Sequence, residues 1–407
     1  MKSRFVQVLL FLLFAVSISA QKKDMLQIQD LLKKGTELDK AQTMAETLLK
    51  DSANQHRADI WLLLGECLYK RYESQNERLY LHQQLDTAAF FANIQRLFSV
   101  YQKVDSFSQS AVRPNKKVLR HLQKRANDLN KCRPNLYHGG LYKLFTKKYN
   151  AAYTYFDDYL KGTNSHLFKA FNYSQTDTLL AKAAFWSVYS GYMNRNPQQM
   201  LHHSYTALKD TANRLTMLQY LSEAYKLEND TSRYIQTLQE GFDGSPSSPY
   251  FFPRLFNHYA SNGDWGKCME LSDKGISVAP ADMLFHVAKS TVLLYTERYD
   301  ECIALCDSII AVSDTLSRAY LNAGLSHYYK AVRLDKLPKK SKADQRNVIA
   351  NYSAARPYLE TYRRLVPGDA DQWALPLYLI YLNLNMGDEF DQIDCILKKK
   401  RISYGHN

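Results

Sequence analysis

Apolar and polar positions recur with helical spacing along most of the chain. The stretch NHYASNGDWGKCMEL, residues 257–271, combines two such segments with an Asn-Gly-Asp corner between them. Gly263 can adopt a positive φ, Asp264 can cap the next helix, and Pro280 ends that helix because it cannot supply a backbone N–H. The pattern therefore predicts a helical hairpin around residue 263.

The same hairpin pattern returns every 34 residues. Units begin at Ala181, Leu215, Pro249, Met283 and Ser317. The second helix carries small or apolar side chains at positions 20 and 27 of each unit. These residues are Met200, Tyr234, Cys268 and Cys302 at position 20, and Ala207, Gly241, Gly275 and Ile309 at position 27. One unit cannot bury the apolar stripes of both its helices, so neighbouring units must stack.

A period of 34 residues with these small positions resembles the tetratricopeptide repeat. The resemblance implies an all-α fold, a right-handed α-solenoid of stacked helix-turn-helix repeats. It is clearest over 133–166 and 181–332, and Trp61, Leu64, Gly65 and Leu68 match a first helix. We expect a single solenoid over 21–407, with an inserted loop at about 333–348 and a C-terminal cap at about 370–407.

The first twenty residues have the features of a secretory signal peptide. Lys2 and Arg4 precede an apolar run at 8–16, and small residues lead to Ala20. This run is shorter than the roughly 20 residues of a spanning helix, which favours a cleaved leader over an uncleaved membrane anchor. No cysteine lies near the expected cleavage site, so a lipid-anchored lipoprotein is not expected. We expect an exported bacterial protein, periplasmic or secreted, with no transmembrane segment after the signal is removed.

The chain carries a formal net charge of +13, which is spread along the sequence with local concentrations at 116–133, 336–342 and 398–401. Solvated helix faces account for such a distribution, and the alternative is a basic patch for an anionic envelope surface or an acidic protein. Export and the lack of an RNA-binding motif exclude nucleic acid as an expected partner.

The residues that could carry chemistry do not form a recognisable catalytic motif. Cys268, Cys302 and Cys306 occupy small apolar positions, which favours buried free thiols over disulfides, although a redox link between Cys302 and Cys306 stays open. His202 and His203 are adjacent and should point to different helix faces. Asp157 and Asp158 are also adjacent, and the sequence places no further acid opposite them to form a catalytic pair. The sequence therefore predicts no catalytic residue, no cofactor, no metal ligand and no enzyme.

The resemblance also indicates where a partner would bind. In this family the concave face is formed by positions 2, 5, 9 and 12 of the first helices. The candidate partner-binding residues at these positions are Gln219, Glu223, Asn257, Thr291, Leu325, Tyr328, Tyr378 and Tyr381. Leu325 and Tyr328 could equally cover neighbouring helices. The resemblance implies a non-enzymatic scaffold that binds a protein or peptide, and the alternative is a binder of carbohydrates or small ligands.

Overall fold

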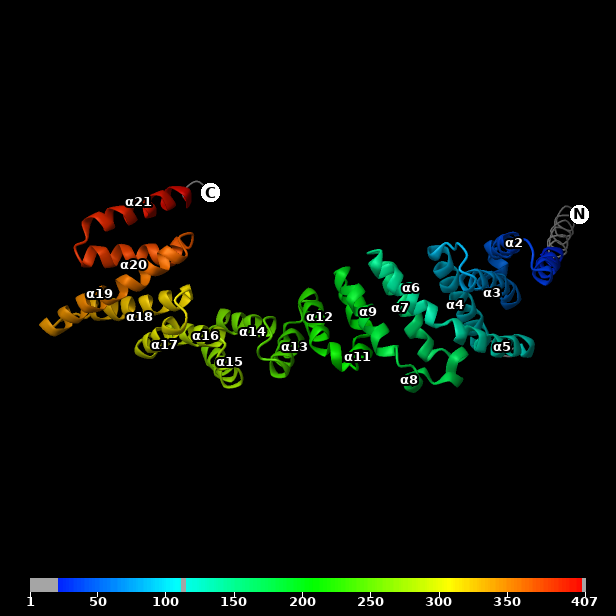
Figure 1. Cartoon of the computed structure of the whole chain (residues 1–407), viewed down its shortest axis with the longest axis horizontal. Coiled ribbons are helices and arrows are strands. Elements are labelled where there is room, and N and C mark those ends of the chain that lie inside the picture. The colour runs from blue at the N-terminus through cyan, green and yellow to red at the C-terminus, as the bar shows by residue number, and fades with distance from the viewer. Residues whose placement is uncertain (1–20, 111–114, 405–407) are drawn as a thin grey trace, which may run out of the picture. The chain divides into compact units, whose positions relative to one another are not determined.

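The chain folds as a series of antiparallel helix pairs (Figure 1). The structure is a computed structural model that describes residues 21–110 and 115–404, and the signal peptide expected at 1–20 lies outside these ranges. In the described ranges the elements are α-helices and short 3-10 helices, with no strand. The all-α fold class of stacked helix-turn-helix units is confirmed.

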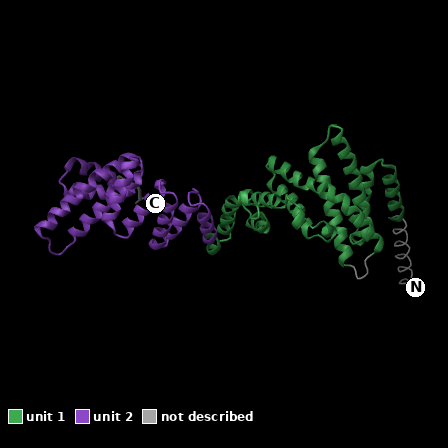
Figure 2. Cartoon of the chain, turned by 60° about the horizontal axis from the view of Figure 1, so that its bottom comes forward, with its two compact units in different colours: residues 1–234 green, residues 235–407 purple. Residues whose placement is uncertain are grey.

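Contacts divide the chain into two compact units, unit 1 over 1–234 and unit 2 over 235–407 (Figure 2). The boundary falls within α13 (Thr231–Gly244). Within the described residues, none of the helices combines the length and the apolar character needed to cross a bilayer.

Unit 1 begins with a helical segment at 21–34. Its further α-helices are α2 (Leu38–Lys50), α3 (Ala58–Tyr80), α4 (Thr87–Ser110), α5 (Lys116–Cys132), α6 (Pro134–Phe145), α7 (Tyr149–Lys161), α8 (Tyr173–Thr176), α9 (Leu180–Met193), α10 (Pro197–His202), α11 (Ser204–Ala207) and α12 (Arg214–Leu227). Four 3-10 helices lie between them: η1 (Ser52–Asn54), η2 (Gly162–Asn164), η3 (His166–Phe171) and η4 (Thr211–Asn213).

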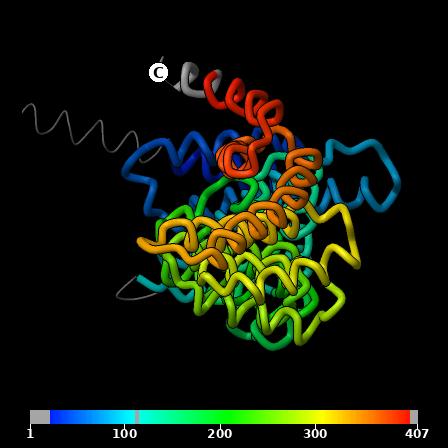
Figure 3. The backbone as a smooth tube through the Cα atoms, turned by 90° about the vertical axis from the view of Figure 1, so that its left-hand side faces the viewer, coloured from blue at the N-terminus to red at the C-terminus, as the bar shows by residue number. Residues whose placement is uncertain are grey.

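Unit 2 continues from α13 as four helical hairpins, whose path runs from yellow-green to red in Figure 3. Its helices are α14 (Phe251–Ser261), α15 (Trp265–Val278), α16 (Met283–Tyr295), α17 (Tyr299–Val312), α18 (Ser317–Asp335), α19 (Lys342–Leu365), α20 (Ala370–Asn383) and α21 (Gly387–Tyr404). Each helix packs on the next, and the first helices α16, α18 and α20 also pack on one another. First helices thus share one face of the stack.

The hairpin joints show the 34-residue period in the backbone. Arg195, Asn229, Gly263 and Glu297 follow one another at this spacing, and all four have positive φ. At each joint the next N–H donates to the carbonyl five residues before it, as Asp264 donates to Tyr259 and Arg298 to Leu293. This hydrogen bond and the left-handed residue form the Schellman end of a helix. The expected recurrence of the corner is confirmed.

The small positions of the second helices are places of close approach. Gly241 and Gly275 both occupy position 27, and each lies directly under a phenylalanine ring of the following helix, Phe251 and Phe285 respectively. Cys268 and Cys302, at position 20, are fully buried. The stripe of small residues expected from the sequence is therefore the surface on which neighbouring repeats pack.

The inserted loop expected at about 333–348 is wrong for most of its length. α18 extends to Asp335, and α19 begins at Lys342, so only 336–341 is irregular. Ser341 starts α19 with a capping box, in which its hydroxyl accepts from Asp344 N and the Asp344 carboxylate accepts from Ser341 N. Val348 and Tyr352 of the extra turns are buried in unit 2, and this burial holds the inserted segment as helix.

Two ion-pair networks stabilise unit 1. Arg133 is buried, with its guanidinium between the rings of Tyr159 and Tyr173, and it pairs with Asp177 at 2.7 Å. Arg125 Nη2 donates to both carboxylate oxygens of Glu66, Oε1 at 2.8 Å and Oε2 at 2.6 Å. Both networks tie together helices that are distant in sequence.

Candidate binding groove

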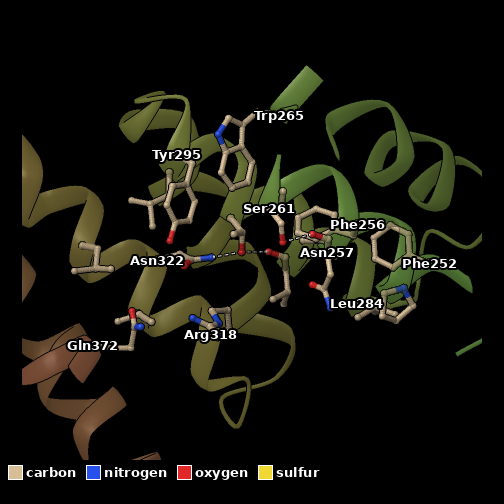
Figure 4. Close-up of a pocket in the computed structure, with 18 residues that line it drawn as sticks. Phe252, Phe256, Asn257, Ser261, Trp265, Leu284, Tyr295, Arg318, Asn322 and Gln372 are labelled. Atoms are coloured by element: carbon tan, nitrogen blue, oxygen red, sulfur yellow. Dashed lines mark hydrogen bonds between the residues drawn. The ribbon is translucent and has the colours of Figure 1, made fainter. Parts of the chain in front are cut away.

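The first helices of unit 2 form a groove of about 540 Å³. Its lining comes from α14, α16 and α18, with Trp265 of α15 and Gln372 of α20 at its margins (Figure 4). These helices are brought together by the repeat itself, since position 9 of each first helix faces the same side of the stack. The groove therefore lies on the side of the first helices that includes position 9, one of the positions that the resemblance assigns to a concave face.

The floor of the groove holds a fixed polar cluster. Asn322 is buried, and its amide donates to Thr291 Oγ1 at 3.0 Å and to Ser290 Oγ at 2.9 Å. Thr291 in turn donates to the carbonyl of Val287 at 3.1 Å. Because these side chains hold one another, the floor presents its polar atoms in one arrangement before any ligand enters.

An aromatic pair lines one side of the groove. The rings of Trp265 and Tyr295 are stacked, with centroids 4.6 Å apart and an interplanar angle of 7°. Trp265 is the first residue of α15 and Tyr295 is the last residue of α16, so two helix ends place the pair. Tyr295 keeps 61% of its surface exposed, which leaves an aromatic face available for contact.

A single cation lines the other side. Arg318, the second residue of α18, is exposed and lies across the groove from the aromatic pair (Figure 4). No Asp or Glu belongs to the lining. Such a guanidinium offers hydrogen-bond donors to a carboxylate brought by a ligand.

Three of the expected partner-binding residues meet in this groove. Asn257 comes from α14, Thr291 from α16 and Leu325 from α18. Asn257 is exposed, Thr291 is half-buried and Leu325 is almost covered, so they run from the rim to the floor.

The other expected residues lie elsewhere. Tyr328 and Tyr381 are buried at 8% and 2% exposure, and Tyr381 donates its hydroxyl proton to Glu360 at 3.0 Å. Tyr378 is half-buried with its ring 4.5 Å from that of Phe390. None of these three lines the groove. Gln219 and Glu223 are half-buried on α12, which belongs to unit 1. Their binding role stays a prediction.

Four residues that line the groove were not predicted from the sequence: Trp265, Tyr295, Arg318 and Asn322. Arg318 had a signal, because it occupies position 2 of the unit that begins at Ser317 and thus belongs to the concave positions. Trp265 and Tyr295 sit outside those positions, on helix ends, and only the hairpin geometry brings their rings together. Asn322 contributes from position 6, between two concave positions.

The cysteines and histidines are also placed. All six cysteines are free, and Cys395 alone is exposed. The Sγ atoms of Cys302 and Cys306 are 4.0 Å apart, and Cys302 donates to the carbonyl of Ser290 at 3.2 Å.

His202 and His203 do not point to different faces as expected. Their rings stack at a centroid distance of 4.1 Å, because the helix breaks at residue 203.

Comparisons with known proteins give no family model and no curated protein that matches this chain. Among solved structures, the C-terminal part of a TPR repeat-containing protein from Cytophaga hutchinsonii is similar. It is 12% identical with a TM-score of 0.40, over 59% of this chain and 92% of that chain. The human IFIT1 dimer with PPP-AAAA is 14% identical with a TM-score of 0.23, over 83% of this chain and 87% of that chain.

Proposed function

We propose that this protein is an exported, non-enzymatic scaffold whose groove in unit 2 binds an extended, carboxylate-bearing segment of a protein partner. The observation that carries the proposal is the composition of the groove. It places an exposed arginine opposite an aromatic pair and has no acidic lining residue. An extended segment could set a carboxylate on Arg318 and an apolar side chain on Tyr295.

The dimensions of the groove suit a short extended peptide. Three first helices line it, and packed helices lie about 8–10 Å apart, so the groove spans roughly 16–20 Å. An extended chain advances about 3.3 Å per residue, which fits five or six residues into that span. The preset floor around Asn322 and Thr291 reduces the ordering that binding would cost.

The contacts divide into an aromatic anchor and a charged anchor. Tyrosine and tryptophan bury a large area with few rotatable bonds and are enriched among residues that dominate interfaces. A hydrogen bond to a charged group contributes about 1.5–3 kcal/mol. Loss of Arg318 should therefore weaken an acidic ligand by roughly 10- to 100-fold.

A peptide-binding experiment on the full mature chain tests the groove. The probes are a fluorescein-labelled library of six-residue peptides with two Asp or Glu positions, and the matched library with Asn or Gln there. We expect polarisation to increase with the acidic library, and Arg318→Ala to weaken that binding by at least tenfold. Arg364→Ala, which removes an exposed arginine of α19 outside the groove, should leave binding unchanged.

Two results would contradict the groove proposal. One is equal binding of the acidic and amide libraries, since Arg318 would then have no role. The other is peptide binding that neither Arg318→Ala nor Tyr295→Ala weakens, since the ligand would then bind elsewhere on the chain.

Export is tested independently of the groove. We expect cell fractionation to find the mature protein outside the cytoplasm, with Gln21 as its first residue. Recovery of the full-length chain from the cytoplasm would contradict export and leave the groove proposal standing.

A carbohydrate ligand is a second candidate, favoured by the exposed ring of Tyr295 stacked on Trp265, because aromatic faces also stack on sugars. A glycan array separates the two. Sugar binding that Tyr295→Ala abolishes and Arg318→Ala does not affect would support this candidate over an acidic peptide.

A further inference from the structure

Unit 1 contains a cluster of two histidines and one aspartate that is unrelated to the groove. His203 Nε2 lies 2.9 Å from Asp157 Oδ1, and His202 Nδ1 lies 3.6 Å from the same oxygen. All three potential ligand atoms lie within 4.8 Å of one another. Asp157 is buried, His203 is half-buried and His202 is exposed, so the cluster is rooted in the core and open to solvent.

A break between two short helices makes the two imidazoles converge. In a continuous helix, adjacent side chains diverge by about 100°. Here α10 ends at His202, α11 begins at Ser204, and His203 has φ −110° and ψ 13°, outside helical values. The break turns both rings toward Asp157 on α7. Neighbouring histidines thereby become a pair that can share one ligand.

The spacing of the three atoms fits a transition-metal ion. Zn²⁺ binds nitrogen and carboxylate oxygen at about 2.0–2.2 Å, which places neighbouring ligands of a tetrahedral site about 3.3–3.5 Å apart. The distances from Asp157 Oδ1 to His203 Nε2 and to His202 Nδ1 are 2.9 and 3.6 Å, one below and one above that range. Imidazole nitrogens favour zinc and similar ions, whereas magnesium and calcium prefer oxygen ligands.

The surrounding side chains orient the carboxylate. Lys161 donates to Asp157 Oδ2 at 2.6 Å and leaves Oδ1 directed at the histidines. One face of α7 carries Tyr153, Asp157 and Lys161 at intervals of four residues, so the helix holds these side chains next to one another. The Tyr153 hydroxyl is 2.9 Å from His202 Nδ1, and a metal ion would displace this hydrogen bond and the one between His203 Nε2 and Asp157 Oδ1.

We infer that Asp157, His202 and His203 form a binding site for a divalent transition-metal ion of the zinc class, with solvent completing the coordination. The site would tie α7 to the α10–α11 segment across more than forty residues of sequence. A ligand that binds the folded state alone stabilises it, so zinc should raise the unfolding temperature of unit 1.

Calorimetric titration of Zn²⁺ into the full mature chain, freed of metal and carrying no histidine tag, tests the site. We expect one zinc per chain, and Co²⁺ in its place should give the strong visible absorption of a tetrahedral site with nitrogen ligands. His202→Ala and His203→Ala should each weaken zinc binding by at least about tenfold. His202 is exposed, so its replacement removes a ligand without disturbing the core.

His166→Ala is the matched control. His166 is exposed and its Nδ1 lies 3.8 Å from Asp105, but it has no second histidine beside it, so zinc binding should be unchanged. Tyr153→Phe should also retain binding, because it removes only one of the two competing hydrogen bonds.

Circular dichroism of each variant confirms that it is folded. Zinc binding that survives in the His202→Ala/His203→Ala double variant would overturn the inference. So would a wild-type chain whose unfolding temperature is the same with and without zinc. Neither result bears on the groove of unit 2.

Discussion

The ring of Phe285 lies directly against the backbone of Gly275, in the space where a side chain on residue 275 would stand. Gly275 is in the second helix of one 34-residue repeat, and Phe285 is in the first helix of the next repeat. The ring can approach so closely because residue 275 has no Cβ. This pair is a place of close approach between two neighbouring repeats, and Gly241 with Phe251 repeats it 34 residues earlier.

Replacement of Gly275 by alanine should therefore destabilise the protein. The added methyl group would meet a phenylalanine ring that neighbouring side chains hold, and overpacking of this kind costs about 1–3 kcal/mol. Gly266→Ala is the control in the same helix, since its nearest atom would be 3.7 Å away and alanine favours helix. Denaturant unfolding should show a lower midpoint for Gly275→Ala and an equal or higher one for Gly266→Ala.

Gly324 is a second such contact, in the pair α18 and α19. A Cβ at this position would lie 2.7 Å from Leu359 Cγ. Gly324→Leu should force the two helices apart and cost roughly 1–3 kcal/mol. The measurement is again the denaturation midpoint, and an unchanged value would mean that the repeat register assigned to α18 is misplaced.

The hairpin joints allow a test of stabilisation. Glu297 holds the left-handed conformation with φ 59°, whereas the equivalent residue one unit earlier is Gly263 with φ 71°. A side chain in this conformation is disfavoured by about 1 kcal/mol, so Glu297→Gly should stabilise the protein by about 0.5–1 kcal/mol. Gly263→Ala should destabilise it by a similar amount. Opposite shifts in the thermal midpoint are expected, and shifts of the same sign would contradict the shared joint geometry.

The Glu66–Arg125 pair predicts how stability depends on pH. Burial alone would raise the pKa of Glu66, but hydrogen bonds from His121 and Arg125 outweigh it and hold the pKa at about 2. A carboxylate whose pKa is lowered on folding contributes stability above its unfolded value of about 4.5 and loses it as the pH falls toward 2. The shift corresponds to roughly 3 kcal/mol. Glu66→Gln should lower stability at pH 7 and flatten the pH dependence between 4.5 and 2, measured by urea unfolding across that window.

Arg133 should be among the most sensitive positions of unit 1. Removal of one partner from a buried ion pair leaves the other charge unpaired and costs about 3–5 kcal/mol. Arg133→Ala would strand Asp177 and also remove the guanidinium from between Tyr159 and Tyr173. Lys161→Ala breaks a more exposed ion pair and should cost about 1 kcal/mol or less. Equal losses in urea unfolding would contradict the ranking.

The repeated fold was predictable because its signals are local. Small side chains at positions 20 and 27 and a turn at the corner are set by the packing of each hairpin on its neighbour, so they leave a period in the sequence. The inserted segment was harder, because Pro338 and its neighbouring lysines suggest a loop. Val348 and Tyr352 pack in unit 2 and make most of it helical.

The candidate sites were only partly predictable, for a different reason. Asn257, Thr291 and Leu325 follow the repeat and meet in the groove as their positions indicate. Trp265 and Tyr295 pair through helix ends, which the concave positions do not describe. The convergence of His202 and His203 depends on a break in one short helix, and no local pattern marks that break.

The equivalence of Gly241 with Gly275, and of Phe251 with Phe285, bears on how such a chain can change its length. Excision of one whole period between the two glycines would leave Gly241 facing Phe285, and the junction would be chemically the same as the one it replaced. Duplication or deletion of a complete period thus preserves this junction, and chains built on it can differ in the number of repeats while keeping their phase.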